Sequence, residues 1–343
     1  MTGKNRFCLY GVLLSVFLLL DGCSTQPQPQ ARTGFYFDTS VTITLYPTDG
    51  LSGEKADALF HDCFALCETY ENMFSRTKEG SDIWRVNHAQ GAPVQVNAET
   101  AALLQQALQY CEKTGGAVDI TIAPLSDLWD FSSEHLEHTS RTPPAPSQIA
   151  ERLSHVDYRN VTVSGNTVTL SDPQAALDLG CIAKGYIADQ IKACLQEQGV
   201  HSAIINLGGN VLTLGNKPDG SPFRLGIQKP FDVRNAPIAS LAVTDASLVS
   251  SGVYERYFEA DGIRYHHLLN TRTGMPENNA LLSVTILSGS SAQGDILSTA
   301  CFLLGLQDGM DFVESLPGVE AVFITEDYEL HPSSGLSGLV QTR

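Results

Sequence analysis

An acid and a hydroxyl lie four residues apart near the C-terminal end of the chain, at Asp295 and Thr299. Residues with this spacing project from the same face of an α-helix, so the carboxylate and the hydroxyl can converge on one hard cation. Oxygen ligands of this kind suit Mg²⁺. The structural alternative is an Asp favoured by the dipole of a helix N-terminus, with the Thr299 hydroxyl bonded back to a backbone carbonyl.

Two glycine-containing segments could approach a phosphate. Lys184 and Gly185 follow Asp178–Ile182 at an expected strand-to-helix junction, where free backbone N–H groups and a cation can hold a phosphate. The glycine spacing differs from that of a Walker loop. Gly208 and Gly209 follow a predicted strand, which is consistent with either a tight bend or the close approach of a ligand.

Two other segments combine polar groups with aromatic rings. Asp119 precedes Trp129 and Phe131, whose rings are more commonly core anchors than ligand contacts. His266 and His267 precede a polar turn, although a histidine in such a place is more often structural than catalytic. Each of these signals is weak when taken separately.

The elements that must position these residues are short strands and a few amphipathic helices. Strands in groups with helices between them favour an α+β fold over a regular βαβ series. Six Cys lie between positions 63 and 301 of the chain. Cys63 and Cys67 are on one face of a predicted helix, and we expect them to pack in the core. We predict strands at 41–46, 201–206, 223–227, 238–244, 281–287 and 321–324, hairpins at 161–170 and around Asp261-Gly262, and helices at 54–74, about 97–114, from 147, at 184–198 and around Asp295.

The N-terminal segment indicates where the protein works. Lys4 and Arg6 precede an apolar run at 7–20, which fits a secretory signal and is short for a bilayer core of about 30 Å. The following Leu-Asp-Gly-Cys23 resembles a bacterial lipoprotein processing box. We therefore expect a signal peptide at 1–22, a Pro-rich tether at 23–33 with lipid on Cys23, and a single globular domain at 34–343. The alternatives are an ordinary cleaved signal or a single N-terminal anchor.

The composition excludes one class of partner. The chain of 343 residues carries 21 Lys plus Arg against 38 Asp plus Glu, a formal charge of -17. This charge repels a polyanion, so we expect no nucleic-acid partner.

The order of the motifs resembles the ApbE family, the FAD:protein FMN transferases. The matching blocks run from about Phe35 to Ile324: Glu71–Arg76, Asp119 with Pro124-Leu125 and Trp129, Ala183–Tyr186 with Asp189, Asn206–Gly209, Ser251–Arg256, His267 with Thr273-Gly274, and Asp295 with Thr299. The resemblance implies an ApbE-like, T-fold-related α+β architecture of two related halves, with mixed or antiparallel sheets, flanking helices and the flavin nucleotide between the halves.

The resemblance also implies a reaction and a set of roles. The enzyme would be extracytoplasmic, held to the cytoplasmic membrane by its lipid, and would use Mg²⁺ to transfer FMN from FAD to a Thr or Ser of an acceptor protein, such as a redox-pump subunit or a secreted reductase. Asp295, Thr299 and the Ala183 carbonyl match the metal ligands, and His267 and Lys184 match catalytic groups. The residues expected around FAD are Glu68, Asp119, Lys184, Gly185, Gly208, Gly209, Ser251 and Gly252.

The chain departs from the family pattern in a few places. Asn210 stands where the family often has Asp, Asn270-Thr271 where it has Asp-Pro, and Phe37-Asp38-Thr39 where it has Met-Gly-Thr. Two other functions share the same machinery in whole or in part. Water in place of the acceptor hydroxyl would make an FAD pyrophosphatase that yields FMN and AMP. A non-catalytic FAD-binding lipoprotein would need only the flavin pocket.

Overall fold

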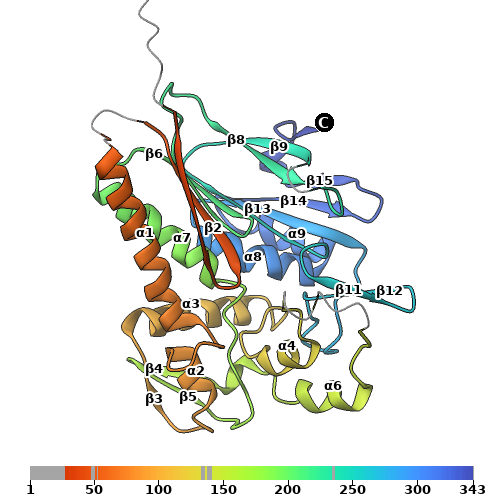
Figure 1. Cartoon of the computed structure of the whole chain (residues 1–343). Helices are drawn as coiled ribbons and strands as arrows, with labels where there is room; N and C mark the ends of the chain where they lie inside the picture. The colour runs from red at the N-terminus through yellow and green to blue at the C-terminus, as the bar shows by residue number, and fades with distance from the viewer. Residues whose placement is uncertain are drawn as a thin grey trace, which may run out of the picture.

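A large antiparallel sheet forms the centre of the molecule. The computed structural model describes residues 28–47, 51, 53–132, 136, 141–233 and 236–342, so the predicted signal peptide and Cys23 lie outside the described residues. The sheet has eight strands in the order β1-β2-β6-β7-β10-β13-β14-β15 (Figure 1). Their bounds are β1 Gln30–Tyr36, β2 Thr39–Leu45, β6 Ser202–Leu207, β7 Asn210–Gly215, β10 Ser247–Gly252, β13 Leu281–Ser288, β14 Val319–Thr325 and β15 Leu330–Pro332.

Four helices cover one face of this sheet (Figure 1). They are α1 (Gly53–Phe74), α7 (Ala183–Glu197), α8 (Ser291–Leu304) and α9 (Leu306–Glu314). In α1 the buried positions recur every three or four residues, as expected for an amphipathic helix. Cys63 and Cys67 are among them and are fully buried, which confirms that they pack in the core. All six Cys of the described residues are free thiols.

A second layer lies below the sheet in the view of Figure 1. It contains the helices α2 (Asp82–Asn87), α3 (Ala98–Lys113), α4 (Ala123–Trp129) and α6 (Pro146–Leu153), the short helix η1 (Tyr158–Asn160), and a sheet of β3 (Val94–Gln95), β5 (Thr167–Leu170) and β4 (Val161–Ser164). The fully buried Trp129 anchors α4, and its Nε1–H donates to the Gly274 carbonyl at 2.8 Å. Trp129 and Phe131 are thus core anchors, although Phe131 also reaches the cavity described below.

The remaining strands form two small sheets. The first has the order β16-β9-β8, with β8 at Phe223–Gln228, β9 at Pro237–Val243 and β16 at Gln341–Thr342. The second is the hairpin of β11 (Tyr257–Ala260) and β12 (Ile263–His266). The short helix η2 (Ser334–Leu336) follows β15. Every strand pair that the structure describes is antiparallel, and the helices are interspersed among the strands, so the predicted α+β class is confirmed. The expected relation between two halves stays a prediction.

The structure corrects the sequence predictions in three places. Residues 30–33, expected in the tether, form the first half of β1 and pair with β2. The central strands β7 and β10 were not predicted from the sequence. No named strand leads directly into α7, which starts after a turn at 179–182, so the expected strand-to-helix junction is a loop-to-helix junction. Among the described residues, no helix combines the length and the apolar character needed to cross a membrane.

Candidate active site

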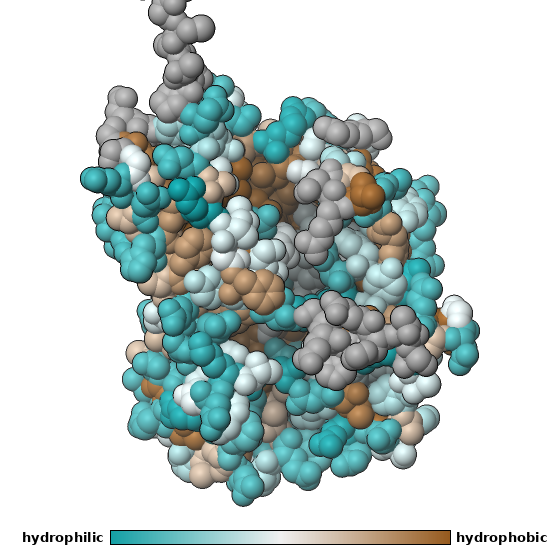
Figure 2. Space-filling model, in the orientation of Figure 1, coloured by the Kyte–Doolittle hydropathy of each residue, from teal (hydrophilic) through white to brown (hydrophobic). Residues whose placement is uncertain are grey.

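A deep cavity of about 1560 Å³ lies between the sheet and the lower layer. Figure 2 shows this face of the molecule hollowed, with apolar residues recessed behind polar ones. The predicted site residues that line the cavity are Asp119, Ala183, Lys184, Gly208, Gly209, Ser251, Gly252, His267, Asp295 and Thr299. The fold thus brings together groups that are up to 180 positions apart in the chain.

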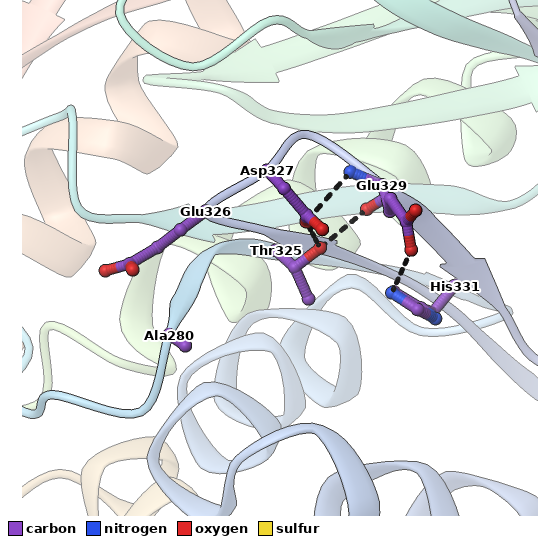
Figure 3. Close-up of a pocket in the computed structure, with 6 residues that line it drawn as sticks. All are labelled: Ala280, Thr325, Glu326, Asp327, Glu329 and His331. Atoms are coloured by element: carbon purple, nitrogen blue, oxygen red, sulfur yellow. Dashed lines mark hydrogen bonds and ion pairs between the residues drawn. The ribbon is translucent and has the colours of Figure 1, made fainter.

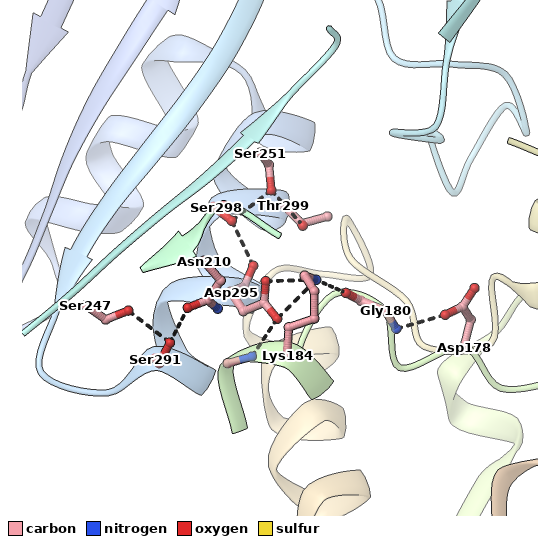
Figure 4. Close-up of polar contacts among 12 residues, drawn as sticks. Asp178, Gly180, Lys184, Asn210, Ser247, Ser251, Ser291, Asp295, Ser298 and Thr299 are labelled. Carbon is pink, nitrogen blue, oxygen red and sulfur yellow. Dashed lines mark hydrogen bonds and ion pairs between the residues drawn. The ribbon is translucent and has the colours of Figure 1, made fainter. Parts of the chain in front are cut away.

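Asp295 lies where α7 meets α8. Its side chain is nearly buried, and Oδ2 accepts a hydrogen bond from the Gly185 backbone N–H at 2.9 Å (Figure 4). The Lys184 ammonium lies 3.3 Å from Oδ1 and also donates to the Gly180 carbonyl at 2.7 Å. The Asp295 side chain is therefore held in place at the cavity wall by one backbone donor and one Lys side chain.

Gly185 permits this contact because it has no side chain. A Cβ built at this position would lie 2.2 Å from the Ser291 carbonyl oxygen of α8. The two helices can therefore approach closely only with glycine here. Gly185 does not line the cavity, and its N–H is engaged by Asp295 rather than free for a phosphate, so it is a positioning residue for the carboxylate.

Thr299 faces the cavity one helical turn after Asp295. Its hydroxyl lies 3.2 Å from Ser251 Oγ of β10. The bond back to a helix carbonyl is made by the neighbouring Ser298, whose Oγ donates to the Asp295 carbonyl at 2.9 Å. Figure 4 shows this polar row along α8. The hydrogen bond to a helix carbonyl, which was the structural alternative for Thr299, is therefore made by Ser298, whereas the Thr299 hydroxyl contacts Ser251.

The two adjacent histidines differ in their surroundings. His266 is buried, with Nε2 bonded to the Glu277 carbonyl at 2.9 Å and Nδ1 accepting from the Leu268 N–H at 3.3 Å. His267 lines the cavity, and its Nδ1 lies 3.3 Å from the Arg256 carbonyl. The neutral His267 ring thus carries its proton on Nδ1, which leaves Nε2 as an acceptor.

Burial lowers the pKa of both rings. The pKa of His266 falls to about 4, mainly because the charged ring would be desolvated. The pKa of His267 falls to about 3, first through desolvation and then through His266 and the cations Arg256 and Lys184. Both imidazoles are consequently neutral at neutral pH.

Two predicted ligand residues have a different environment from the one expected. Glu68 is exposed on α1 and does not line the cavity. The α1 carboxylate that does so is Glu71, whose Oε1 accepts from the Phe37 N–H at 2.8 Å. Asp119 lines the cavity, but its oxygens accept from Thr121 and from the Tyr158 N–H at 2.6 to 2.8 Å. These bonds indicate that Asp119 organises the cavity wall.

Sequence reasoning about roles missed several charged residues of the cavity. Arg76 forms an ion pair with Asp178 at 3.0 Å and a second one with Asp127. Arg256 pairs with Asp38 at 3.2 Å. Both arginines lie inside the motif blocks that resemble the family, and this position in the sequence could have identified them as cavity residues. The cavity is lined by eight acidic residues and four Lys or Arg, so it offers no surplus of positive charge to a diphosphate.

The donor set of the cavity fits a hard cation. Asp295 supplies a carboxylate, Thr299 a hydroxyl and Ala183 a backbone carbonyl, and all three residues line the cavity. No cluster of three or more His, Cys, Asp or Glu with metal-binding geometry occurs among the described residues. A magnesium site with one carboxylate and neutral oxygens does not require such a cluster.

A smaller pocket lies at the hairpin between β14 and β15 (Figure 3). Its polar groups bond mainly to one another, as in the 3.3 Å hydrogen bond from Thr325 Oγ1 to the Glu329 carbonyl. None of the predicted site residues lines it. The large cavity is therefore the candidate active site.

Comparison with known proteins identifies the family of this chain. The model of the ApbE family matches residues 37–323. The chain belongs to the ApbE family. It is 37% identical over 297 residues to an FAD:protein FMN transferase of Klebsiella pneumoniae, covering 86% of this chain and 88% of that protein. It is 31% identical over 350 residues to one of Treponema pallidum, covering 96% and 95%.

Solved structures show the same fold. The ApbE protein of Thermotoga maritima superimposes with a TM-score of 0.80 at 29% identity, covering 91% of this chain and 99% of that chain. Family and fold together identify the chain as an enzyme, a transferase.

Proposed function

We propose that the chain transfers FMN from FAD to a Thr or Ser hydroxyl of an extracytoplasmic acceptor protein and releases AMP. The observation that carries this proposal is the convergence of Asp295, Thr299, Lys184 and His267 on one cavity in a member of the ApbE family. The relatives named FAD:protein FMN transferase support the choice of substrate.

Asp295, Thr299 and the Ala183 carbonyl would hold Mg²⁺. When bound, Mg²⁺ acts as a Lewis acid that offsets the negative charge of the diphosphate. The cavity needs such a contribution, because its acidic residues outnumber its Lys and Arg. Gly185 and Lys184 fix the Asp295 carboxylate through the contacts described above, so this ligand is oriented before the substrate arrives.

His267 would accept the proton of the acceptor hydroxyl. A hydroxyl hardly ionises at neutral pH, so a base must take its proton as the bond to phosphorus forms. The hydrogen bond from Nδ1 to the Arg256 carbonyl directs the unprotonated Nε2 away from the backbone. The ring is neutral at neutral pH, so the lone pair of Nε2 carries no proton.

Mixing the protein with FAD, Mg²⁺ and an acceptor that carries a candidate Thr tests the proposal. Covalent flavin fluorescence on the acceptor in a denaturing gel supports it. Release of FMN and AMP without labelling of the acceptor would favour the pyrophosphatase, and FAD binding without turnover would favour the flavin-binding lipoprotein.

Asp295→Asn is expected to reduce Mg²⁺-dependent transfer at least 100-fold, because the replacement keeps the shape but removes the charge that attracts the cation. The rate is measured as a function of Mg²⁺ concentration. Asp308→Asn, on the exposed face of α9, is the matched control and should behave like the wild type. Full transfer by Asp295→Asn at the same Mg²⁺ concentration would refute the metal role.

We also propose that the enzyme is a lipoprotein on the outer side of the cytoplasmic membrane. The support is the sequence of residues 1–33, with Cys23 as the lipidated residue. Radiolabelled palmitate should be incorporated by the wild type and not by Cys23→Ala. Equal incorporation by both proteins would contradict the assignment.

A further inference from the structure

One part of the cavity wall is aromatic and partly exposed. Phe231, in the loop after β8, is 37% exposed and lines the cavity together with Tyr254 and Tyr257. The Phe231 ring meets both tyrosine rings edge to face, with centroid distances of 6.1 Å to Tyr254 and 5.5 Å to Tyr257. These three residues are called the aromatic wall below.

Arg264 anchors the aromatic wall to the β11–β12 hairpin. Its guanidinium carbon lies 4.0 Å from the centre of the Phe231 ring and 5.3 Å from that of the Tyr257 ring. The same guanidinium forms an ion pair with Glu259 on the neighbouring strand at 3.0 Å. The loop that carries Phe231 is thus joined to the hairpin whose second strand leads into His267.

The aromatic wall lies next to the candidate base. Tyr257 follows Arg256, whose carbonyl accepts hydrogen bonds from the His267 backbone N–H at 3.1 Å and from its Nδ1 at 3.3 Å. Tyr257 is also paired with His266 across the hairpin. A molecule that contacts Tyr257 therefore lies beside the backbone that holds His267.

The backbone of Phe231 has an unfavourable conformation. Its φ is +60°, in the left-handed region, where the Cβ of a bulky residue is crowded. Gly or Asn would adopt this conformation more easily. A strained residue that keeps a large apolar ring partly exposed at a cavity indicates a role in binding rather than in folding.

The adjoining strand exposes its backbone to the cavity. Gly226, in the middle of β8, is exposed and lines the cavity, and because glycine has no side chain, the exposed atoms belong to the backbone itself. Among the strands that the structure describes, β8 pairs with β9 alone. A glycine inside a strand often marks the close approach of another backbone. An extended polypeptide can therefore lie against β8 and place a side chain on the aromatic wall.

We infer that Gly226 and the aromatic wall form the docking surface for the acceptor protein, which lies on them as an extended segment with its Thr or Ser beside His267. The inference rests on the proposed function, which requires a protein hydroxyl to reach Nε2 of His267. The docking surface belongs to β8, the loop after it and residues 254–257, whereas the predicted metal ligands lie on α7 and α8. The acceptor and the diphosphate would thus be held by different elements.

The first test measures FMN transfer as a function of acceptor concentration, with the soluble acceptor domain that the wild type labels as the probe. Phe231→Asn keeps a residue suited to left-handed backbone but removes the ring, so KM for the acceptor should rise about tenfold or more, as for an aromatic anchor of an interface. FAD affinity, measured by flavin fluorescence, should stay unchanged. Phe231→Tyr, which retains the ring, should keep the wild-type KM.

Val233→Ala is the matched control for this variant. Val233 lies in the same loop and is 74% exposed, but it does not line the cavity. Its replacement should leave KM for the acceptor and the affinity for FAD unchanged.

Hydrogen exchange is the second test. In the presence of FAD and a chelator of Mg²⁺, the acceptor should bind without transfer, and the backbone amides of residues 223–231 should exchange more slowly than in its absence. The internal control is β1, another edge strand, because none of its residues lines the cavity. Its exchange should not change.

An unchanged KM in Phe231→Asn, or unchanged exchange at 223–231, would overturn the inference. Weaker FAD binding by this variant would assign the ring to the flavin, and conversion of a wild-type dimer to a monomer in light scattering would assign it to a second copy of the chain. Either result would also overturn the inference. Transfer by the wild type would persist in all these cases. Absent labelling by the wild type would instead remove the proposed function, and this inference with it.

Discussion

At the scale of single residues, the two adjacent histidines have different surroundings. His266 has both ring nitrogens engaged inside the protein, whereas His267 has one nitrogen bonded to the backbone and lines the cavity. Their side chains are chemically identical, so the surroundings decide which of them can accept a proton from a substrate. His267, which the motif order predicts as the catalytic histidine, is the one of the two that lines the cavity, and its catalytic role stays a prediction.

His267→Gln is expected to reduce the rate constant for FMN transfer by about 100-fold to 10,000-fold, the usual contribution of a general base. FAD binding should change only a few-fold, because no charge is lost from the neutral ring. Single-turnover transfer and flavin fluorescence separate the two quantities. The exposed His201, replaced in the same way, is the control. A transfer rate close to that of the wild type would remove His267 from the mechanism.

At the scale of elements, the close contact between α7 and α8 assembles the acidic end of the site. Gly185→Ala places a methyl group against the Ser291 carbonyl and must push the helices apart, because the obstacle is backbone. Overpacking of this kind costs about 1 to 3 kcal/mol in the free energy of unfolding. Transfer should fall more than stability alone explains, because the Gly185 N–H would also leave Asp295.

Urea unfolding and the Mg²⁺ dependence of transfer measure the two effects of Gly185→Ala. Gly53→Ala in α1 is the control, since a Cβ there meets nothing within 4 Å. Its effect on stability should be small, because Ala is the better helix former. Equal stability and activity of Gly185→Ala and the wild type would contradict the close approach of the two helices.

At the scale of the whole molecule, the buried histidines make stability dependent on pH. The pKa of His266 is lowered to about 4 and that of His267 to about 3, both chiefly by desolvation, from an ordinary value of 6.5. Between the folded and the unfolded pKa values, the unfolded chain binds protons that the folded protein does not. The contribution of the two neutral histidines to the free energy of unfolding is therefore fully present above pH 6.5 and is lost as the pH falls toward the folded pKa values. Each histidine contributes a slope of up to about 1.4 kcal/mol per pH unit.

Urea unfolding of the protein without ligands at pH 7.5 and pH 5 measures this effect. The free energy of unfolding should be lower at pH 5, and the difference should shrink in His267→Gln. Carboxylates with lowered pKa values titrate mainly below this range and contribute little to the difference. A pH difference as large in His267→Gln as in the wild type would show that His267 is accessible to protons in the folded state.

The sequence by itself determined the elements that have a strong local pattern. The 3.6-residue spacing of apolar positions predicts α1 and α3, and alternation around a Gly-Asn turn predicts the hairpin of β4 and β5. Spacing within α8 placed Asp295 and Thr299 on one face, because a helix sets that geometry locally. The motif order supplied the family and the reaction.

Only the tertiary structure decided which groups share the cavity. The strands β7 and β10 were not predicted because they lie inside the sheet, with a neighbouring strand on each side. In addition, Ser250 and Ser251 of β10 line the cavity. Neither strand therefore shows a simple alternation of apolar and polar residues. Three features depend on contacts between residues far apart in the chain. They are the position of Glu71, and not Glu68, at the cavity wall, the cap that Asp189 forms on α8, and the unpaired amide of Asn210. No local pattern encodes such contacts, because long-range packing creates them.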